Sequence, residues 1–154
     1  MTIDLRPVDA DNWLDVIALS VHPEQEELVP STAWSLAEAY IKPEAPRRGY
    51  YPLAAYDGDQ LVGFLSITCS ASSDRDYWIN GLVIDKSCQG KGYGRATMIA
   101  AMTYIKTTFP QCIQIGVTIV PGNDPASGLY ASLGFVDTGI VYDGEIEWIC
   151  KVKD

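Results

Sequence analysis

The sequence predicts a mixed α/β fold with seven strands in a mostly antiparallel sheet. Apolar and polar residues alternate over several short stretches, which is the pattern of half-buried strands. Asp57-Gly58 and Asp143-Gly144 are typical of tight turns between antiparallel strands. A long helical pattern separates two further strand-like runs, and such a connection indicates a parallel pair with a right-handed crossover.

The predicted elements follow the order β-α-α-β-β-β-α-β-α-β-β. The strands are expected at 2–8, 50–56, 61–69, about 77–84, 112–120, 135–142 and 145–152, and the helices at about 11–20, 32–42, 92–109 and 125–133. Asp9 or Asp11 can cap the first helix, and Ser31 can cap the second. The pattern shows no repeat and no linker, so residues 1–154 are expected to form a single domain.

Apolar spacing predicts which faces of the helices are buried. Trp13, Val16 and Ile17 share one face of the first helix. The apolar positions that recur along the long helix are Met98, Met102, Ile105 and Phe109. Both faces are expected to pack on the sheet.

The chain is acidic, with 20 Asp and Glu against 11 Lys and Arg and a formal net charge of −9. A nucleic-acid surface needs clustered Lys and Arg, so nucleic acid is not an expected partner. An acidic surface attracts a cationic substrate, although acidity also serves solubility alone. No apolar run approaches the roughly 20 residues of a bilayer span, and no secretion signal is visible. We therefore expect a soluble cytoplasmic protein with no membrane partner.

The cysteines and the histidine show no metal-ligand spacing. His22 is the only histidine, and no C-x-x-C pair is present. Cys69, Cys112 and Cys150 lie in or beside apolar runs, where Cys acts as a small hydrophobe. Cys88 lies in a polar loop and is expected to be the most exposed of the four. Neither a disulfide nor a metal site is expected.

A glycine-rich turn opens the long helix, with the sequence Gln89-Gly90-Lys91-Gly92-Tyr93-Gly94. A helix N-terminus presents free N–H groups and a partial positive charge, and glycine lets the backbone curl around an anion. With Lys91 and Arg95 beside it, the turn predicts a phosphate site, although a plain strand-to-helix turn also needs glycine. The spacing is neither that of a P-loop nor that of the dinucleotide fingerprint.

A second motif opens the last helix, with the sequence Asn123-Asp124-Pro125-Ala126-Ser127-Gly128-Leu129-Tyr130, and Gly134-Phe135 follow it. The glycine turn resembles the Q/R-x-x-G-x-G/A acetyl-CoA signature of the GNAT N-acetyltransferase superfamily, and the second motif resembles its N-x-x-A-x-x-L-Y…G-F element. The element order is similar as well, so the resemblance covers nearly the whole chain. The stretches from Leu19 onward and from Tyr51 to Phe64 resemble the spermidine/spermine (polyamine) N-acetyltransferase subgroup.

The resemblance implies a GNAT-type acyl-CoA N-acyltransferase fold with acetyl-CoA as co-substrate and no metal. The cofactor-binding residues that it implies lie on the fourth strand, in the glycine turn and in the second motif. They are Leu82, Val83, Ile84, Gln89, Gly90, Lys91, Gly92, Tyr93, Gly94, Arg95, Asn123, Ala126 and Tyr130. Dimers are common in the superfamily, so a homodimer is an open expectation.

The catalytic positions that the resemblance implies are Tyr130 and Asn80. A tyrosine O–H near the thioester can protonate the leaving thiolate; a ring that merely packs in the core is the alternative. Polyamine acetyltransferases often carry a carboxylate where this chain has Asn80. Because Asn cannot act as a base, proton transfer through water or to a carboxylate from elsewhere stays open, as does a CoA-binding regulatory domain without turnover.

The expected acceptor is a primary amine of a small cation, first of all a polyamine such as spermidine or spermine. The loop at 22–30 lies where that subgroup places part of its acceptor site. Its carboxylates Glu24, Glu26 and Glu27 would attract a polycation, and Trp34 and Trp78 would wall the groove. A solvated loop and core aromatics are the alternatives. Another amine, such as an antibiotic or a peptide N-terminus, also stays open.

Overall fold

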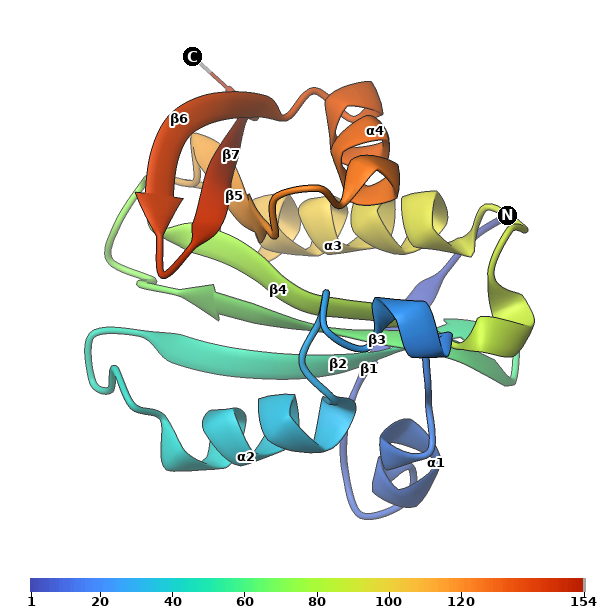
Figure 1. Ribbon diagram of the computed structural model, residues 1–154. Coiled ribbons are helices and arrows are strands. Elements are labelled where there is room, and N and C mark those ends of the chain that lie inside the picture. Colours follow the sequence, from blue (N-terminus) through green and yellow to red (C-terminus); the bar gives the residue numbers. More distant parts are fainter. Residues whose placement is uncertain (154) are drawn as a thin grey trace.

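The computed structural model describes residues 1–153 and has the predicted order of elements (Figure 1). The strands are β1 (Asp4–Pro7), β2 (Gly49–Asp57), β3 (Gln60–Cys69), β4 (Tyr77–Ile84), β5 (Gln114–Ile119), β6 (Val136–Tyr142) and β7 (Glu145–Lys151). The helices are α1 (Trp13–Ile17), α2 (Thr32–Ile41), α3 (Tyr93–Thr108) and α4 (Asp124–Ser132), with 3-10 turns at Pro23–Gln25 and Lys86–Cys88. Most predicted boundaries are confirmed to within a few residues.

The seven strands form one sheet in the order β1-β2-β3-β4-β5-β7-β6. Among the described residues, β4 and β5 are the only parallel neighbours, and the other pairs are antiparallel. The two predicted hairpins are confirmed by the facing pairs Asp57 with Gln60 and Tyr142 with Glu145. The crossover through α3 is confirmed as well, since this helix joins the two parallel strands.

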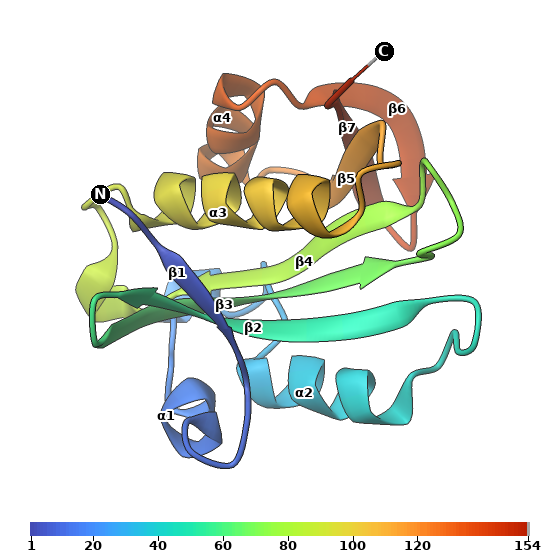
Figure 2. The same cartoon turned by 180° about the vertical axis from the view of Figure 1, so that it is seen from behind.

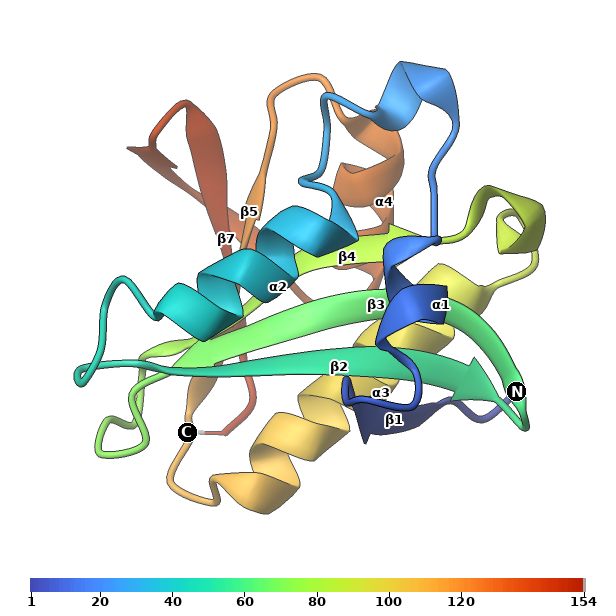
Figure 3. The same cartoon turned by 90° about the horizontal axis from the view of Figure 1, so that it is seen from below.

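Helices cover both faces of the sheet. The short α1 and the longer α2 pack on one face, against β2, β3 and β4 (Figures 1 and 3). On the other face, α3 packs against β1, β3 and β4, and Figure 2 shows β1 beside it. Met98 and Ile105 of α3 are fully buried and Phe109 nearly so, which confirms the predicted apolar face of this helix.

The parallel strands β4 and β5 diverge from a single registered pair, Trp78 opposite Gly116. A Cβ on Gly116 would lie 2.4 Å from the ring of Trp78, so this position must be glycine for the indole to lie across β5. Beyond this pair the two strands share no further registered residues among those described. The divergence opens the sheet between its two halves, and the site described below lies there.

Two local predictions are wrong. The helix expected at 11–20 is only five residues long, and neither Asp9 nor Asp11 caps it: the Asp9 carboxylate accepts the N–H groups of Asp11 and Asn12 in a turn before the helix. A helix of this length presents one residue to the sheet. Val16 is fully buried, whereas Trp13 is 46% and Ile17 is 39% exposed.

The second error concerns Cys88. Its side chain is 3% exposed and packs in a small cluster with Ile3, Ala55 and Val62, because the 3-10 turn folds it back against the sheet. All four cysteines are buried free thiols. By contrast, the predicted cap of α2 is confirmed, since the Ser31 hydroxyl accepts the N–H of Trp34 at 3.1 Å.

Candidate functional site

A cleft of about 260 Å³ lies between β4, α4 and the loop at 21–29. We call it the β4–α4 cleft. Its lining comes mostly from the two sequence motifs and from the strand that leads into the glycine turn. The residues are Val21, Gln25, Leu28, Val29, Leu82, Ile84, Gln89, Gly90, Gly94, Asn123, Pro125, Ala126, Leu129 and Tyr130. The structure therefore brings most of the expected cofactor-binding residues to one surface.

Five expected cofactor residues lie outside this cleft. The side chain of Val83 is buried, and Lys91 donates to the carbonyl of Ser87. The hydroxyl of Tyr93 donates to Asp57 at 2.7 Å and thus points toward the β2–β3 turn. Gly92 and Arg95 line a separate hollow of about 810 Å³ between α3 and the N-terminal strand. That hollow is larger, but it carries no part of the second motif.

A side chain holds the glycine turn at its first end, whereas its second end carries no side-chain cap. The Asp85 carboxylate accepts the N–H groups of Ser20 and Ser87, at 3.0 and 3.1 Å. Although burial alone would raise the pKa of Asp85, these bonds and the one from the Ser87 hydroxyl hold it below its usual value. At the other end, Gly92 is the cap of α3 and makes no side-chain bond to the helix. The free N–H groups of the first turn are thus left for an anion.

Gln89 lines the cleft and also joins the glycine turn to the N-terminal loop. Its amide exchanges two hydrogen bonds with Gln25, at 2.9 and 3.0 Å, and also donates to the carbonyl of Ile84. The backbone N–H of His22 donates to the same Gln25 amide. The sequence gives no local sign of this pairing across 64 positions, which ties the N-terminal loop to the glycine turn.

Two residues of the second motif stabilise the start of α4. Asn123 is the cap of α4, and its side-chain oxygen accepts the N–H of Ala126 at 3.4 Å. Pro125 stands in the first turn, where a missing N–H costs nothing. This geometry turns the start of α4, and with it Ala126 and Tyr130, toward β4.

A β-bulge interrupts β4 where it borders the cleft. Asn80 faces Ser66 and Val83 faces Phe64, so Gly81 and Leu82 lie opposite the single residue between them. Gly81 has φ +62°, a conformation that glycine adopts without strain. A bulge leaves its extra residue outside the ladder of backbone hydrogen bonds. Backbone groups of the segment Gly81–Leu82 are therefore left outside the ladder with β3 at the point where the sheet opens.

Tyr130 stands at the inner end of the cleft. Its side chain is 9% exposed, and its ring packs at 5.7 Å from the ring of Phe135. Burial raises the pKa of Tyr130 to about 12. The phenol therefore keeps its proton at neutral pH and can act as a hydrogen-bond donor.

A second cavity, of about 160 Å³, lies in the divergence of β4 and β5, and we call it the β4–β5 opening. It shares six lining residues with the β4–α4 cleft: Leu28, Val29, Leu82, Asn123, Ala126 and Tyr130. On its far side it is lined by Asn80, Thr118 and Glu145, among others. The side-chain N–H of Asn80 donates to the Thr68 hydroxyl at 2.8 Å, which fixes the amide against β3.

A third cavity, of about 420 Å³, adjoins the opening through Asn80 and Thr118, and we call it the α2 cavity. Its remaining lining residues are Glu38, Glu44, Arg48, Tyr50, Thr68, Trp78, Tyr142 and Asp143. Three carboxylates thus face this cavity against one guanidinium. Of the three, Glu38 and Asp143 form no ion pair within residues 1–153. The cavity is therefore acidic.

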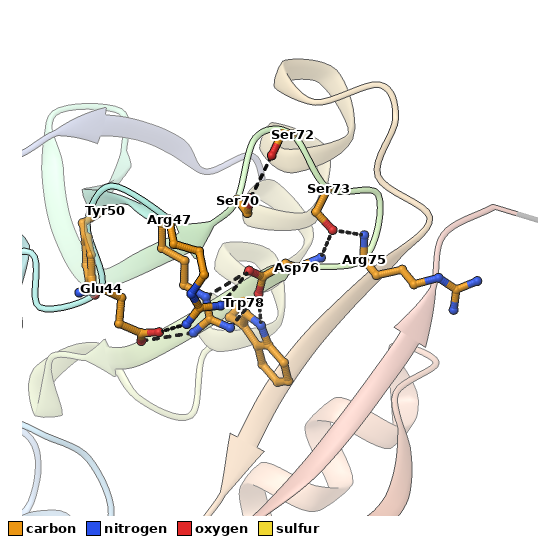
Figure 4. Close-up of polar contacts among 10 residues, drawn as sticks. Glu44, Arg47, Tyr50, Ser70, Ser72, Ser73, Arg75, Asp76 and Trp78 are labelled. Atoms are coloured by element: carbon orange, nitrogen blue, oxygen red, sulfur yellow. Dashed lines mark hydrogen bonds and ion pairs between the residues drawn. The ribbon is translucent and has the colours of Figure 1, made fainter.

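A network of two carboxylates and two arginines adjoins the α2 cavity, which it reaches through Glu44 and Arg48 (Figure 4). Arg48 binds Asp76 through two nitrogens, at 3.0 and 2.7 Å, and binds Glu44 at 3.1 Å. Arg47 contacts the same two carboxylates. Trp78 donates to Asp76 at 2.9 Å. Burial alone would raise the pKa of Asp76, but the bonds from Arg48 and Trp78 together hold it below its usual value.

The residues expected at the acceptor site do not all come together. Trp78 lines the α2 cavity. Glu26 lines a different hollow of about 270 Å³, beside Ser20 and Val83. Glu24 and Glu27 are exposed, and Trp34 is 66% exposed on the surface of α2. Their role in acceptor binding stays a prediction.

Local sequence patterns do not reveal the carboxylates that the fold gathers around these cavities: Glu38, Glu44, Asp143 and Glu145. They belong to α2, to the loop after it, to the β6–β7 turn and to the first position of β7. Asp143 attracted attention only as a turn residue. No pattern at short spacing connects these positions, so only the order of the strands could have indicated that they meet.

Comparison with known proteins identifies the family. The sequence pattern of the family described as acetyltransferase (GNAT) family matches residues 8–135, which include both motifs. The chain belongs to this family. It is accordingly an N-acetyltransferase, as the two motifs predicted, and the mixed sheet with its diverging parallel strands is the family's fold.

Individual relatives cover nearly the whole chain. The spermine/spermidine N(1)-acetyltransferase of Bacillus subtilis (strain 168) is 30% identical over 94% of this chain and 95% of its own length. The structure of an acetyltransferase from Thermus thermophilus superimposes with a TM-score of 0.69, covering 99% of this chain and 98% of that one at 21% identity. A spermidine N-acetyltransferase from Vibrio cholerae, solved in complex with CoA and spermine, has a TM-score of 0.67 over 96% of this chain and 93% of its own at 18% identity.

Two further observations concern the described residues. No helix within residues 1–153 has both the length and the apolar character needed to cross a bilayer. Within the same residues, no group of three or more His, Cys, Asp or Glu side chains is placed to hold a metal ion.

Proposed function

We propose that this protein transfers an acetyl group from acetyl-CoA to a primary amine of a polyamine such as spermidine or spermine. The observation that carries the proposal is the acidic α2 cavity, which adjoins the opening where Tyr130 stands. Its carboxylates match a molecule with several ammonium groups. The 30% sequence identity with a spermine/spermidine N(1)-acetyltransferase supports the same acceptor.

The arm of acetyl-CoA that carries the acetyl group would lie in the β4–α4 cleft. The N-terminus of α3 and the glycines before it would bind the pyrophosphate, because free N–H groups and the helix dipole favour an anion there. The pantetheine arm would follow β4 past Ile84 and Leu82, toward Tyr130 and Asn123. These assignments explain why the two motifs meet along one cleft.

Transfer would take place in the β4–β5 opening, where both substrates meet. The displaced backbone at the bulge would donate a hydrogen bond to the thioester oxygen as negative charge develops on it. Tyr130, whose pKa is raised to about 12, would donate to the departing sulfur. A thiol has a pKa of about 8.5, so a hydrogen bond to the sulfur is favoured over complete transfer of the phenolic proton.

Rates with a panel of amines test the acceptor. Release of CoA thiol would be measured with spermidine, spermine, diamines of rising length and monoamines of the same carbon count. A polyamine acceptor predicts a KM that falls as ammonium groups are added and rises with salt, because screening weakens the attraction. Equal KM values for monoamines and polyamines would favour another amine. A thermal shift with CoA but no turnover with any amine would favour a binding domain.

Three further expectations from the sequence remain predictions. We propose that residues 1–154 act as one acetyltransferase domain, because residues from the N-terminal and the C-terminal parts of the chain line both cavities. A homodimer and a cytoplasmic location stay predictions.

A further inference from the structure

Acetyl transfer to an amine needs a proton acceptor, and the expected position for one holds Asn80. An alkylammonium has a pKa of about 10.4, so the acceptor arrives mostly protonated at neutral pH. An amide cannot take its proton, and Asn80 is already bonded to Thr68. The chemistry therefore requires a carboxylate from another part of the chain, or transfer to bulk water.

The carboxylates of the arginine network are poorly suited to this role. Glu44 and Asp76 are both bound by Arg47 and Arg48, and Asp76 also accepts the indole N–H of Trp78 (Figure 4). A carboxylate held by opposite charges favours its ionised form, which makes it a weaker base. Asp76 also lines neither the β4–β5 opening nor the α2 cavity.

Glu145 is different, because it lines the β4–β5 opening itself, together with Asn80 and Tyr130. Its one hydrogen bond among the described residues comes from the Thr118 hydroxyl at 3.4 Å, and no Lys or Arg of residues 1–153 forms an ion pair with it. Its side chain is partly buried. Most of its capacity to accept hydrogen bonds is thus available to a substrate.

The strand order explains how Glu145 reaches this place. It begins β7, which pairs with β5 so that Ile119 faces Ile146. Since β5 is also the strand that diverges from β4, the start of β7 stands across the opening from Asn80. The two residues are far apart in sequence and meet only through the fold.

We propose that Glu145 is the proton acceptor of the acetyl transfer, an inference that rests on the proposed function. An alkylammonium carries three N–H protons and the amide product carries one. Glu145 takes the first proton, directly or through one water, and frees the lone pair that attacks the thioester carbon. The C–N bond forms, the C–S bond breaks, and the second proton ends on the sulfur. Glu145 then returns its proton to the solvent.

Substitution of Glu145 by Gln tests this role, since Gln keeps the shape and loses the basicity. With spermidine, kcat should fall by roughly 10²- to 10⁴-fold, the usual contribution of one general base. The Kd for CoA and the Tm should stay at parental values. The matched control is Asp15→Asn, which removes one negative charge from the exposed surface of α1 and should leave kcat unchanged.

Two readouts separate proton transfer from a structural role. In an aminooxy analogue of spermidine the reacting nitrogen is neutral at pH 7 and needs no first deprotonation, while the other amines keep their charge. The loss caused by Glu145→Gln should therefore be much smaller with it. Formate should restore part of the rate of Glu145→Ala, because it can replace the missing carboxylate. A Gln variant with parental kcat would overturn the proposal, as would an equal loss with both acceptors and no rescue. If instead the parent acetylates no polyamine, the proposed function itself fails.

Discussion

The β4–α4 cleft and the α2 cavity are built in opposite ways. Most residues that line the cleft come from two continuous segments, 82–94 and 123–130. The groups expected to bind the cofactor there are backbone groups of a glycine turn, a helix start and a bulge. The cavity draws its lining from α2, the loop after it, strands β2 to β5 and the β6–β7 turn. Its chemistry comes from side chains.

This difference determines how well each site can be recognised from the sequence alone. A backbone site for an anion needs glycines at fixed positions next to a helix start, and these residues stand together in the chain. A site made of carboxylates needs only acidic residues that the fold brings together, and acidic residues are common on every surface. The first kind of site can be predicted from a motif, whereas the second needs the topology.

Tyr130 lies on the boundary between the two regions, and its substitution should have the largest effect. Tyr130→Phe keeps the ring against Phe135 and removes only the hydroxyl. If the hydroxyl stabilises the leaving sulfur, single-turnover rates at saturating substrates should fall by roughly 10²- to 10⁴-fold, with little change in CoA affinity. Since the pKa of Tyr130 is raised to about 12, its ionisation should not limit the parental rate between pH 6 and 10.

Tyr104→Phe is the matched control, because it removes a phenol from α3 at a position that lines neither the cleft nor the opening. Its rate should equal that of the parent. A mild rate loss with weakened CoA binding for Tyr130→Phe would instead mean that the residue positions the thioester.

Gly92→Asp tests the backbone half of the comparison. It places a carboxylate at the cap of α3, where it competes with the pyrophosphate for the free N–H groups. Charged hydrogen bonds of this kind contribute about 1.5–3 kcal/mol, so the Kd for CoA should rise by roughly 10- to 100-fold. Calorimetry measures this directly.

The matched control is Gly58→Asp in the β2–β3 turn. Gly58 also has a positive φ and open space around it, so the strain and the added charge are similar. It should bind CoA like the parent. Equal Kd values for the two variants would show that the glycine turn does not hold the pyrophosphate.

Substitution of carboxylates in the α2 cavity tests whether side chains of this cavity bind the acceptor. Glu38→Gln combined with Asp143→Asn removes two negative charges that no ion pair within residues 1–153 compensates. Asn also tolerates the left-handed backbone that Asp143 adopts. Exposed charge pairs contribute about 0.2–1 kcal/mol each, so the loss of two should raise the KM for spermine by roughly 2- to 30-fold.

The increase in the KM for spermine should shrink at high salt, and the KM for a monoamine should change much less. An unchanged KM for spermine at low salt would mean that the acceptor does not enter this cavity.

The sequence was sufficient for the element order, the parallel crossover and the meeting of the two motifs at one cleft, because each depends on local patterns. It failed at α1, where a helical pattern continues beyond the five residues that can pack, and at Cys88, whose polar neighbours suggested exposure. It could not indicate Glu145, because that residue reaches Asn80 only through the order β4-β5-β7. Contacts across a sheet depend on strand order, which short-range spacing does not contain.

Substitution of the loop carboxylates should have the smallest effect on the KM for spermine. It also compares the acceptor site that the resemblance predicted with the one that the cavities indicate. The resemblance to polyamine acetyltransferases pointed to Glu26 and Glu27, whereas in the structure neither lines the α2 cavity or the β4–β5 opening. Glu26 and Glu27 are exposed, as are Glu38 and Asp143, so the two pairs differ in whether they line the α2 cavity and not in their exposure. A charge outside the cavity acts on the acceptor only through a long-range attraction that water and salt screen. The double variant Glu26→Gln and Glu27→Gln removes as much charge as the cavity pair, so each double variant is the control of the other. We expect the loop variant to change the KM for spermine by less than about twofold, and to do so equally for all amines. If it raises that KM as much as the cavity pair does, the polycation extends along the loop at 22–30, and the motif-based prediction of the acceptor site is the better one.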